Sequence, residues 1–245
     1  MIATFTALLF AHTLADYVFQ TGWMVAHKRK PAVLLLHIAL VLATAQAVLG
    51  TVFAPELLAL AAAHLVIDAL KLSLSKQDGL GAYLADQAAH LLTLAALAAY
   101  APDLWARGLW AAQTYVAPAL VLHLMVLAAG ALLAVRAGGF AVGKLMARFD
   151  TPLPAEGLAE GGLMIGLLER GLIYLLLMTG QPGSIGFLIA AKSVMRFETA
   201  SKEQKAAEYV IIGTLASFGW AIAITLGVIA LRDGLPALEI SAQRP

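Results

Sequence analysis

The sequence predicts an all-α, polytopic membrane protein of about eight transmembrane helices. The first observation is composition: 61% of the 245 residues are hydrophobic and 13% are charged, whereas a soluble domain carries about 25% charged residues. The second is that apolar runs long enough to cross a bilayer recur along the whole chain. The third is that turn-forming residues separate these runs.

The expected spans follow one another with short connections. They cover residues 3–26, 32–53, 56–75, 82–100, 113–136, 161–180, 184–198 and 207–231. The clearest breaks fall at HKRKP (27–31), FAP (53–55), SKQDGLG (75–81) and APD (101–103), where proline, glycine and polar residues favour turns.

Residues 137–160 interrupt this series. Phe140 and Met146 are interleaved with Lys144 and Arg148, a pattern typical of a short amphipathic helix at the membrane interface. The sequence DTPLPAEGLAEGG then forms a linker. We therefore expect a histidine- and aspartate-bearing transmembrane bundle over 1–136, an interfacial helix and linker over 137–160, and a C-terminal transmembrane region over 161–245.

The basic residues predict the orientation. With the N-terminus outside, twelve basic residues lie at the inside turns and span ends: Lys28, Arg29, Lys30, Lys71, Lys76, Arg136, Lys144, Arg148, Lys192, Arg196, Lys202 and Lys205. Three lie outside: Arg107, Arg232 and Arg244. Because cytoplasmic loops carry the excess of Lys and Arg, we expect a multi-pass protein of the bacterial cytoplasmic (inner) membrane with its N-terminus outside.

Histidine and carboxylate side chains lie inside the first four apolar runs. They are His12, Asp16, His37, His64, Asp68, Asp86 and His90. Ionisable side chains are costly in hydrocarbon, so a cluster of them indicates a functional site. The pairs 12/16, 64/68 and 86/90 are each four residues apart, which places both members of a pair on one helix face.

The first four spans also look duplicated. The HTLAD sequence at 12–16 resembles HLVID at 64–68, and the next in-span histidines, His37 and His90, follow at nearly equal offsets. We therefore expect two helical hairpins, 3–53 and 56–100, that share one orientation, as in parallel repeats. Asp86 has Val33 as its counterpart, so the site should be asymmetric. The helix rise places the cluster on the cytoplasmic side of the membrane.

We expect the seven in-span residues to bind a divalent transition metal, with zinc preferred and one or two ions in the site. Imidazole and carboxylate suit this chemistry, and the absence of cysteine excludes thiolate ligands. Asp16 is also the candidate general base, and Gln20 and Lys71 extend the same helix faces toward a substrate. The alternatives are a proton-relay or ion-coupling site and polar side chains that only join helices. His27 and His123 are not expected to be ligands.

The second half carries a separate charged set. Glu169 and Arg170 are adjacent in the middle of a span and point about 100° apart, so each needs a partner on another helix. Lys192 and Arg196 lie one helical turn apart near the cytoplasmic end of the next span. These four residues are candidates for binding a lipid headgroup. The alternative is that the basic side chains snorkel while Arg170 pairs with a glutamate.

Several segments resemble a known family. The sequences HTLADYVFQTGWM, HLVIDALK and DQAAH resemble bacterial membrane proteins of domain-of-unknown-function family 3307 (DUF3307). GLLERGLIYLLL, IGFLIAAKSVMRFE and EYVIIGTLASF resemble the C-terminal part of longer members of this family. The resemblance implies no established activity. More loosely, HxxxD on apolar helices is similar to membrane-bound metal-dependent hydrolases of the YdjM type, which implies hydrolysis by fold-level analogy.

We therefore expect a membrane-embedded, metal-dependent hydrolase that acts on a lipid or lipid-linked phosphate. The alternatives are an ion- or proton-coupled transporter of small solutes and a non-enzymatic scaffold or partner-binding subunit. Membrane lipids and the lipid substrate are the expected partners, and a homo-oligomer is left open. A net charge of +1 indicates no nucleic-acid partner.

Overall fold

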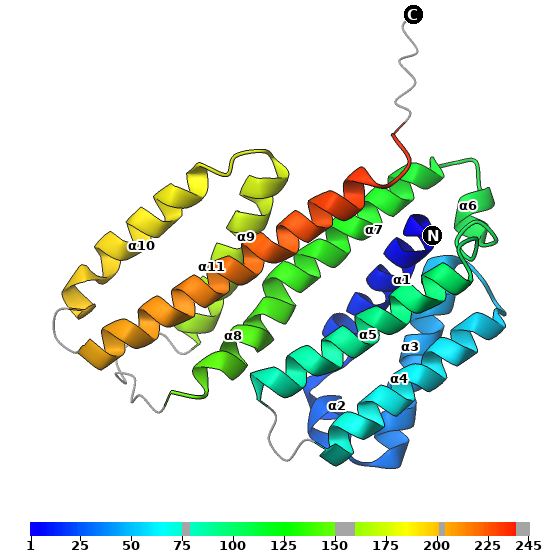
Figure 1. Cartoon of the computed structure of the whole chain (residues 1–245), viewed down its shortest axis with the longest axis horizontal. Coiled ribbons are helices and arrows are strands. Elements are labelled where there is room, and N and C mark those ends of the chain that lie inside the picture. The colour runs from blue at the N-terminus through cyan, green and yellow to red at the C-terminus, as the bar shows by residue number, and fades with distance from the viewer. Residues whose placement is uncertain (75–78, 150–159, 201–203, 239–245) are drawn as a thin grey trace, which may run out of the picture. The chain divides into compact units, whose positions relative to one another are not determined.

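The computed structural model describes residues 1–74, 79–149, 160–200 and 204–238 (Figure 1). For residues 195–200 it describes the backbone only. These residues form helices and no strand. The helices are α1 (Ile2–Leu14), η1 (Ala15–Phe19), α2 (Gly22–His27), α3 (Pro31–Leu49), α4 (Pro55–Leu74), α5 (Leu80–Tyr100), α6 (Leu109–Ala112), α7 (Pro118–Leu132), η2 (Leu133–Ala137), α8 (Gly138–Met146), α9 (Gly161–Met178), α10 (Ser184–Ala200) and α11 (Gln204–Asp233).

Six helical segments are long and apolar enough to cross a membrane: Ile2–Phe19, Pro31–Leu49, Pro55–Leu74, Pro118–Met146, Gly161–Met178 and Gln204–Asp233. The prediction of an all-α polytopic membrane protein is thereby confirmed. The other two expected spans correspond to α5, which is long but carries Asp86, Gln87 and His90, and to α10, whose apolar part is the shorter Ser184–Val194. The total of eight spans stays a prediction.

The chain divides into two compact units. The first comprises the described residues within 1–77, 84–129 and 230–245, and the second those within 78–83 and 130–229. The boundaries fall inside α5, α7 and α11, and the division of the chain expected from its sequence stays a prediction. All seven candidate metal ligands belong to the first unit, and Glu169, Arg170 and Lys192 belong to the second.

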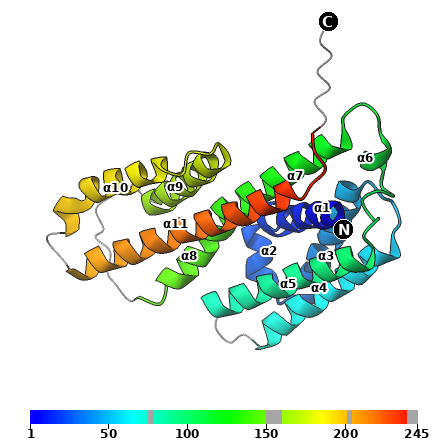
Figure 2. The same cartoon turned by 45° about the horizontal axis from the view of Figure 1, so that its top comes forward.

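The first unit is built around α3, which packs against both α1 and α4. Figures 1 and 2 both show α1, α3, α4 and α5 side by side. Gly50 ends α3 in the left-handed conformation (φ 67°), which glycine adopts without a steric penalty. Its carbonyl accepts a hydrogen bond from Leu109 N at 2.9 Å, and the Trp110 indole donates to Ala47 O at 2.8 Å. These bonds hold the 101–112 segment against the end of α3.

Two π-helical turns interrupt otherwise α-helical segments. The first, η1, contains Asp16, and π-turns are frequent at functional sites. The second, η2, joins α7 to α8, so residues 118–146 form one helical segment. The interfacial helix expected from residue 137 is therefore not separate. Helix continues there because Gly138 gives room for the side chain of Trp220 in the second unit. Most of the expected linker falls within residues 150–159, which lie outside the described residues.

Candidate metal centre

All seven candidate ligands meet in one buried cluster of the first unit. His12 comes from α1, Asp16 from η1, His37 from α3, His64 and Asp68 from α4, and Asp86 and His90 from α5. Six of them are buried, and the Asp16 side chain is 10% exposed. If α1 and η1 are counted as one continuous helix, four histidines and three carboxylates from four helical segments thus meet in the interior of the first unit.

Four ligand atoms from three of these segments lie at nearly equal separations. His37 Nε2 lies 3.2 Å from His64 Nε2 and 3.4 Å from Asp16 Oδ1. Asp68 Oδ2 lies 3.6 Å from each of the two Nε2 atoms. The distance from His64 Nε2 to Asp16 Oδ1 is 3.7 Å.

These separations have the size of the edges of a zinc coordination tetrahedron. A regular tetrahedron whose metal–ligand bonds are about 2.0–2.2 Å long has edges of about 3.3–3.6 Å. Five edges of the set His37, His64, Asp16 and Asp68 span 3.2–3.7 Å. The donor types and these five of the six edges therefore fit a divalent metal held by His37, His64 and Asp68, with Asp16 close to both histidines.

Asp68 links this set to a second one on α5. Its Oδ1 atom lies 3.9 Å from His90 Nε2, which lies 3.5 Å from Asp86 Oδ1. His90 Nε2 and Asp86 Oδ1 are both buried and have no hydrogen-bond partner among the described residues. Buried polar atoms ordinarily find a partner, so this pair fits a second ion that shares the Asp68 carboxylate.

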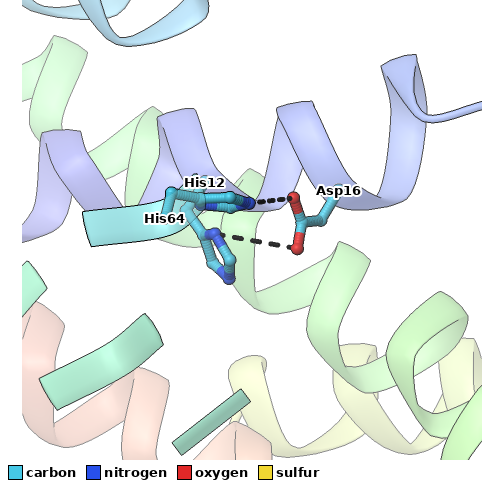
Figure 3. A group of neighbouring side chains, drawn as sticks. All are labelled: His12, Asp16 and His64. Atoms are coloured by element: carbon cyan, nitrogen blue, oxygen red, sulfur yellow. Dashed lines mark ion pairs between the residues drawn. The ribbon is translucent and has the colours of Figure 1, made fainter. Parts of the chain in front are cut away.

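His12 lies at the edge of the cluster. Figure 3 shows the Asp16 carboxylate facing the imidazoles of His12 and His64 from one side, with one oxygen directed at each. His12 Nδ1 is 3.9 Å from Asp16 Oδ2. The groups His12/Asp16/His64, His37/His64/Asp68 and Asp68/Asp86/His90 each place three ligand atoms within 4.8 Å of one another.

Corresponding pairs of the two hairpins make corresponding contacts. His37 reaches Asp16 at 3.4 Å, and its counterpart His90 reaches Asp68 at 3.9 Å. Within the HxxxD segments the distances are 3.9 Å in the first hairpin and 3.6 Å in the second. This agreement supports the internal repeat.

Two lysines contact the cluster carboxylates. Lys28 Nζ lies 2.8 Å from Asp68 Oδ2, and Lys71 Nζ lies 2.9 Å from Asp86 Oδ2. Lys71 was a candidate from the sequence, whereas Lys28 was counted only as an orientation signal. Lys28 lies on the turn that follows α2. A position on a turn does not indicate whether the side chain points toward the cluster.

A pair of neutral side chains was also missed. Gln87 Nε2 donates to Asp86 Oδ2 at 3.2 Å, and Tyr17 OH donates to Gln87 Oε1 at 2.8 Å. The sequence offered one signal for them: Tyr17 directly follows Asp16, and Gln87 directly follows Asp86. Gln20, by contrast, has a buried Nε2 atom that finds no hydrogen-bond partner among the described residues.

The remaining candidates lie elsewhere. His27 Nδ1 contacts Trp23 O at 2.9 Å and His123 Nδ1 contacts Ala119 O at 2.8 Å, each within its own helix. In the second unit Lys192 Nζ lies 2.6 Å from Glu169 Oε2, and Arg170 contacts α11 and η2. The side chain of Arg196 lies outside the described residues.

Comparison with known proteins identifies one family. The chain matches DUF3307, a family described as proteins of unknown function, over residues 4–117. The matched region runs from α1 to the start of α7 and contains every residue of the cluster. No curated protein and no solved structure matches the chain at a significant level.

Proposed function

Residues 4–117 match the DUF3307 family of proteins of unknown function, and we propose that this protein is a membrane-embedded, metal-dependent hydrolase. Its substrate is a lipid or a lipid-linked phosphate. The observation that carries the proposal is the set of four ligand atoms from His37, His64, Asp16 and Asp68 at the spacing of a zinc tetrahedron. Zinc is the proposed ion because it accepts mixed nitrogen and oxygen ligands in this geometry.

A catalytic zinc site keeps one position for water. In the proposed site His37, His64 and Asp68, which are all buried, hold the ion. Asp16, which is the most exposed of the four, is the general base. The two roles of Asp16 are alternatives: as a ligand it would fill the fourth position, and as a base it would leave that position to a water and accept its proton. The metal supplies a water of lowered pKa and polarises the phosphate.

The lysines support an anionic substrate. Asp68 and Asp86 contact Lys28 and Lys71 at hydrogen-bond distance. When these carboxylates ligate a metal, part of their charge is directed to the ion, and the ammonium groups become available to phosphate oxygens. Lysine is a common phosphate binder. The Lys71 side chain is 27% exposed, so it is reached from outside the cluster.

Two ions are compatible with the second ligand set. Asp68 would bridge them, with Asp86 and His90 completing the second position. Paired metals stabilise both the attacking and the leaving oxygen of a phosphoryl displacement. The alternative arrangement has one ion, with Asp86 and His90 as a proton-transfer pair beside it.

An ion- or proton-coupled transporter is the second candidate function. The π-helical turn at Asp16 favours it, because transporters bind their coupling ions where a transmembrane helix loses its regular form. In this alternative Asp16 and Asp68 exchange protons or cations during transport, and Lys28 is the competing cation for Asp68.

The proposal places the protein in the bacterial cytoplasmic membrane with its N-terminus outside and the cluster toward the cytoplasm. The basis is the distribution of Lys and Arg along the sequence. Lys28 and Lys71 stand at the cytoplasmic ends of their helices in this orientation. Membrane lipids are the proposed partners.

The test combines metal analysis with an activity assay. The full chain is purified without chelator, and its metal content is measured by mass spectrometry for the wild type, His64→Ala and the control His123→Ala. We expect stoichiometric zinc in the wild type and the control and its loss in His64→Ala. The same proteins are incubated with short-chain phosphatidic acid, and the phosphate released is measured. Zinc binding without phosphate release would favour the transporter, and absence of a bound metal would refute the hydrolase.

A further inference from the structure

The second unit contains a buried cation without a carboxylate partner. Arg170 lies in the middle of α9 and is 3% exposed. Its Nε donates to Val135 O and its Nη1 to Ser217 Oγ, both at 3.0 Å. Among the described residues no carboxylate lies within 4.0 Å of its guanidinium, and no hydrogen bond uses Nη2. An unpaired charge in a membrane span is costly.

The neighbouring carboxylate is already neutralised. Glu169 Oε2 lies 2.6 Å from Lys192 Nζ, and the same ammonium lies 5.5 Å from the ring centroid of Phe218. The three charged side chains therefore carry a net charge of +1, located on Arg170. The sequence left open whether a glutamate pairs with this arginine, and the structure assigns Glu169 to Lys192.

Arg170 lines a cavity between α9 and α11. The cavity has a volume of about 170 Å³ and its walls include Gly162, Gly166 and Arg170 on α9, and Tyr209, Gly213 and Ser217 on α11. Each trio is spaced four residues apart and therefore occupies one helix face. From Gly162 to Arg170 the helix rises about 12 Å, so the cavity extends from the first turn of α9 to the guanidinium.

Glycines provide the space that the guanidinium occupies. A Cβ atom at Gly166 would lie 3.1 Å from Arg170 Nη1, and one at Gly139 would lie 3.2 Å from Nη2. Both distances are tighter than ordinary carbon contacts. The backbone of η2 and α8 thus approaches the arginine closely on one side, while the cavity lies on another. The guanidinium is held in one orientation by its two hydrogen bonds and these contacts.

We infer that this cavity binds a phosphate group, with Arg170 as its anchor. A fixed guanidinium presents parallel N–H donors that match phosphate oxygens. Ser217, Thr214 and Tyr209 add hydroxyl groups to the cavity wall, and Lys192 adds a second cation. A phosphate has enough acceptor oxygens for several of these donors at once. The inference does not depend on the metal-dependent hydrolase, because every residue it uses belongs to the second unit.

The phosphate has two possible sources, which a binding assay on the full chain in neutral detergent separates. One arm titrates short-chain phosphatidic acid, the second titrates short-chain phosphatidylcholine, and the third titrates inorganic phosphate. Affinity is measured by calorimetry. Binding of phosphatidic acid alone identifies a lipid headgroup with a phosphate monoester, and binding of inorganic phosphate as well identifies the free anion as sufficient.

Three variants test the location. Gly162→Leu places a side chain in the cavity wall where a Cβ meets no atom within 4 Å, so the fold should tolerate it. Gly186→Leu on α10 is the matched control, since a Cβ there also meets no atom and the residue does not line the cavity. Arg170→Gln removes the charge.

We expect Gly162→Leu and Arg170→Gln to weaken binding by about ten-fold or more, the size of one charge-assisted hydrogen bond. Gly186→Leu should bind as the wild type does. If circular dichroism shows that Arg170→Gln is unfolded, the affinity of Gly162→Leu alone tests the inference. Equal affinity in Gly162→Leu and the wild type, or no binding in any arm, would overturn the inference.

Discussion

Removal of His37 and removal of His12 should have very different effects on zinc affinity. His37 Nε2 lies 3.2–3.6 Å from the three other atoms of the proposed tetrahedron. His12 Nδ1 lies farther out, 3.9 Å from Asp16 Oδ2, and a ligand atom of His12 lies within 4.8 Å of one of His64. The sequence already makes His12 the least certain of the seven candidates, because the helix rise places it deeper in the membrane than the others.

The expected magnitude follows from the number of ligands. Four-ligand structural zinc sites bind with about 10–16 kcal/mol, or about 3 kcal/mol per ligand. His37→Ala should therefore weaken zinc binding by about 100-fold or more. His12→Ala removes a neighbour of a ligand, and such outer positions cost about ten-fold.

The assay is a competition titration of the full chain in detergent against a chromophoric zinc chelator. His123→Ala is the matched control, because His123 contacts only its own helix. Equal losses in His37→Ala and His12→Ala would refute the assignment of the tetrahedral set, and so would an unchanged affinity in His37→Ala.

Two further perturbations test the site and the fold. Lys28→Met removes the ammonium 2.8 Å from a buried carboxylate, and it should lower the stability of the metal-free protein by about 1–3 kcal/mol. Thermal unfolding with chelator and with zinc should show a smaller loss with zinc, and equal losses would contradict this reasoning. Gly108→Ala would place a Cβ 1.8 Å from Leu49 O. It should destabilise the protein by about 2–4 kcal/mol, whereas Gly81→Ala, which meets no atom, should not.

The residue types of the candidate site could be found by local arguments. An ionisable side chain in an apolar run is conspicuous at any position, and a separation of four residues defines a shared helix face. The repeat of HxxxD added that two hairpins contribute equivalent groups. These arguments identified His64 and Asp68 without knowledge of any neighbouring helix.

Residues that enter the site from a turn or through a neutral group could not be found in this way. Lys28 follows the short helix α2, and its direction depends on how that helix is held against α3. Gln87 and Tyr17 are ordinary in composition and acquire a role only because α1 and α5 lie close together. The sequence predicted a helix after residue 137 but not that it continues from the preceding span, where Gly138 packs beside Trp220.

The sequence by itself determined the class of the protein, the positions of most membrane helices and the set of polar residues inside them. These properties depend on hydropathy and on the 3.6-residue period, which are local. Only the tertiary structure decided which candidate ligands lie close together: His37 Nε2 and His64 Nε2 are 3.2 Å apart, while His12 Nδ1 lies 3.9 Å from Asp16 Oδ2. It likewise decided that Glu169 pairs with Lys192 and not with Arg170. The physical reason is that distances between helices depend on how each helix is rotated and crossed against its neighbours.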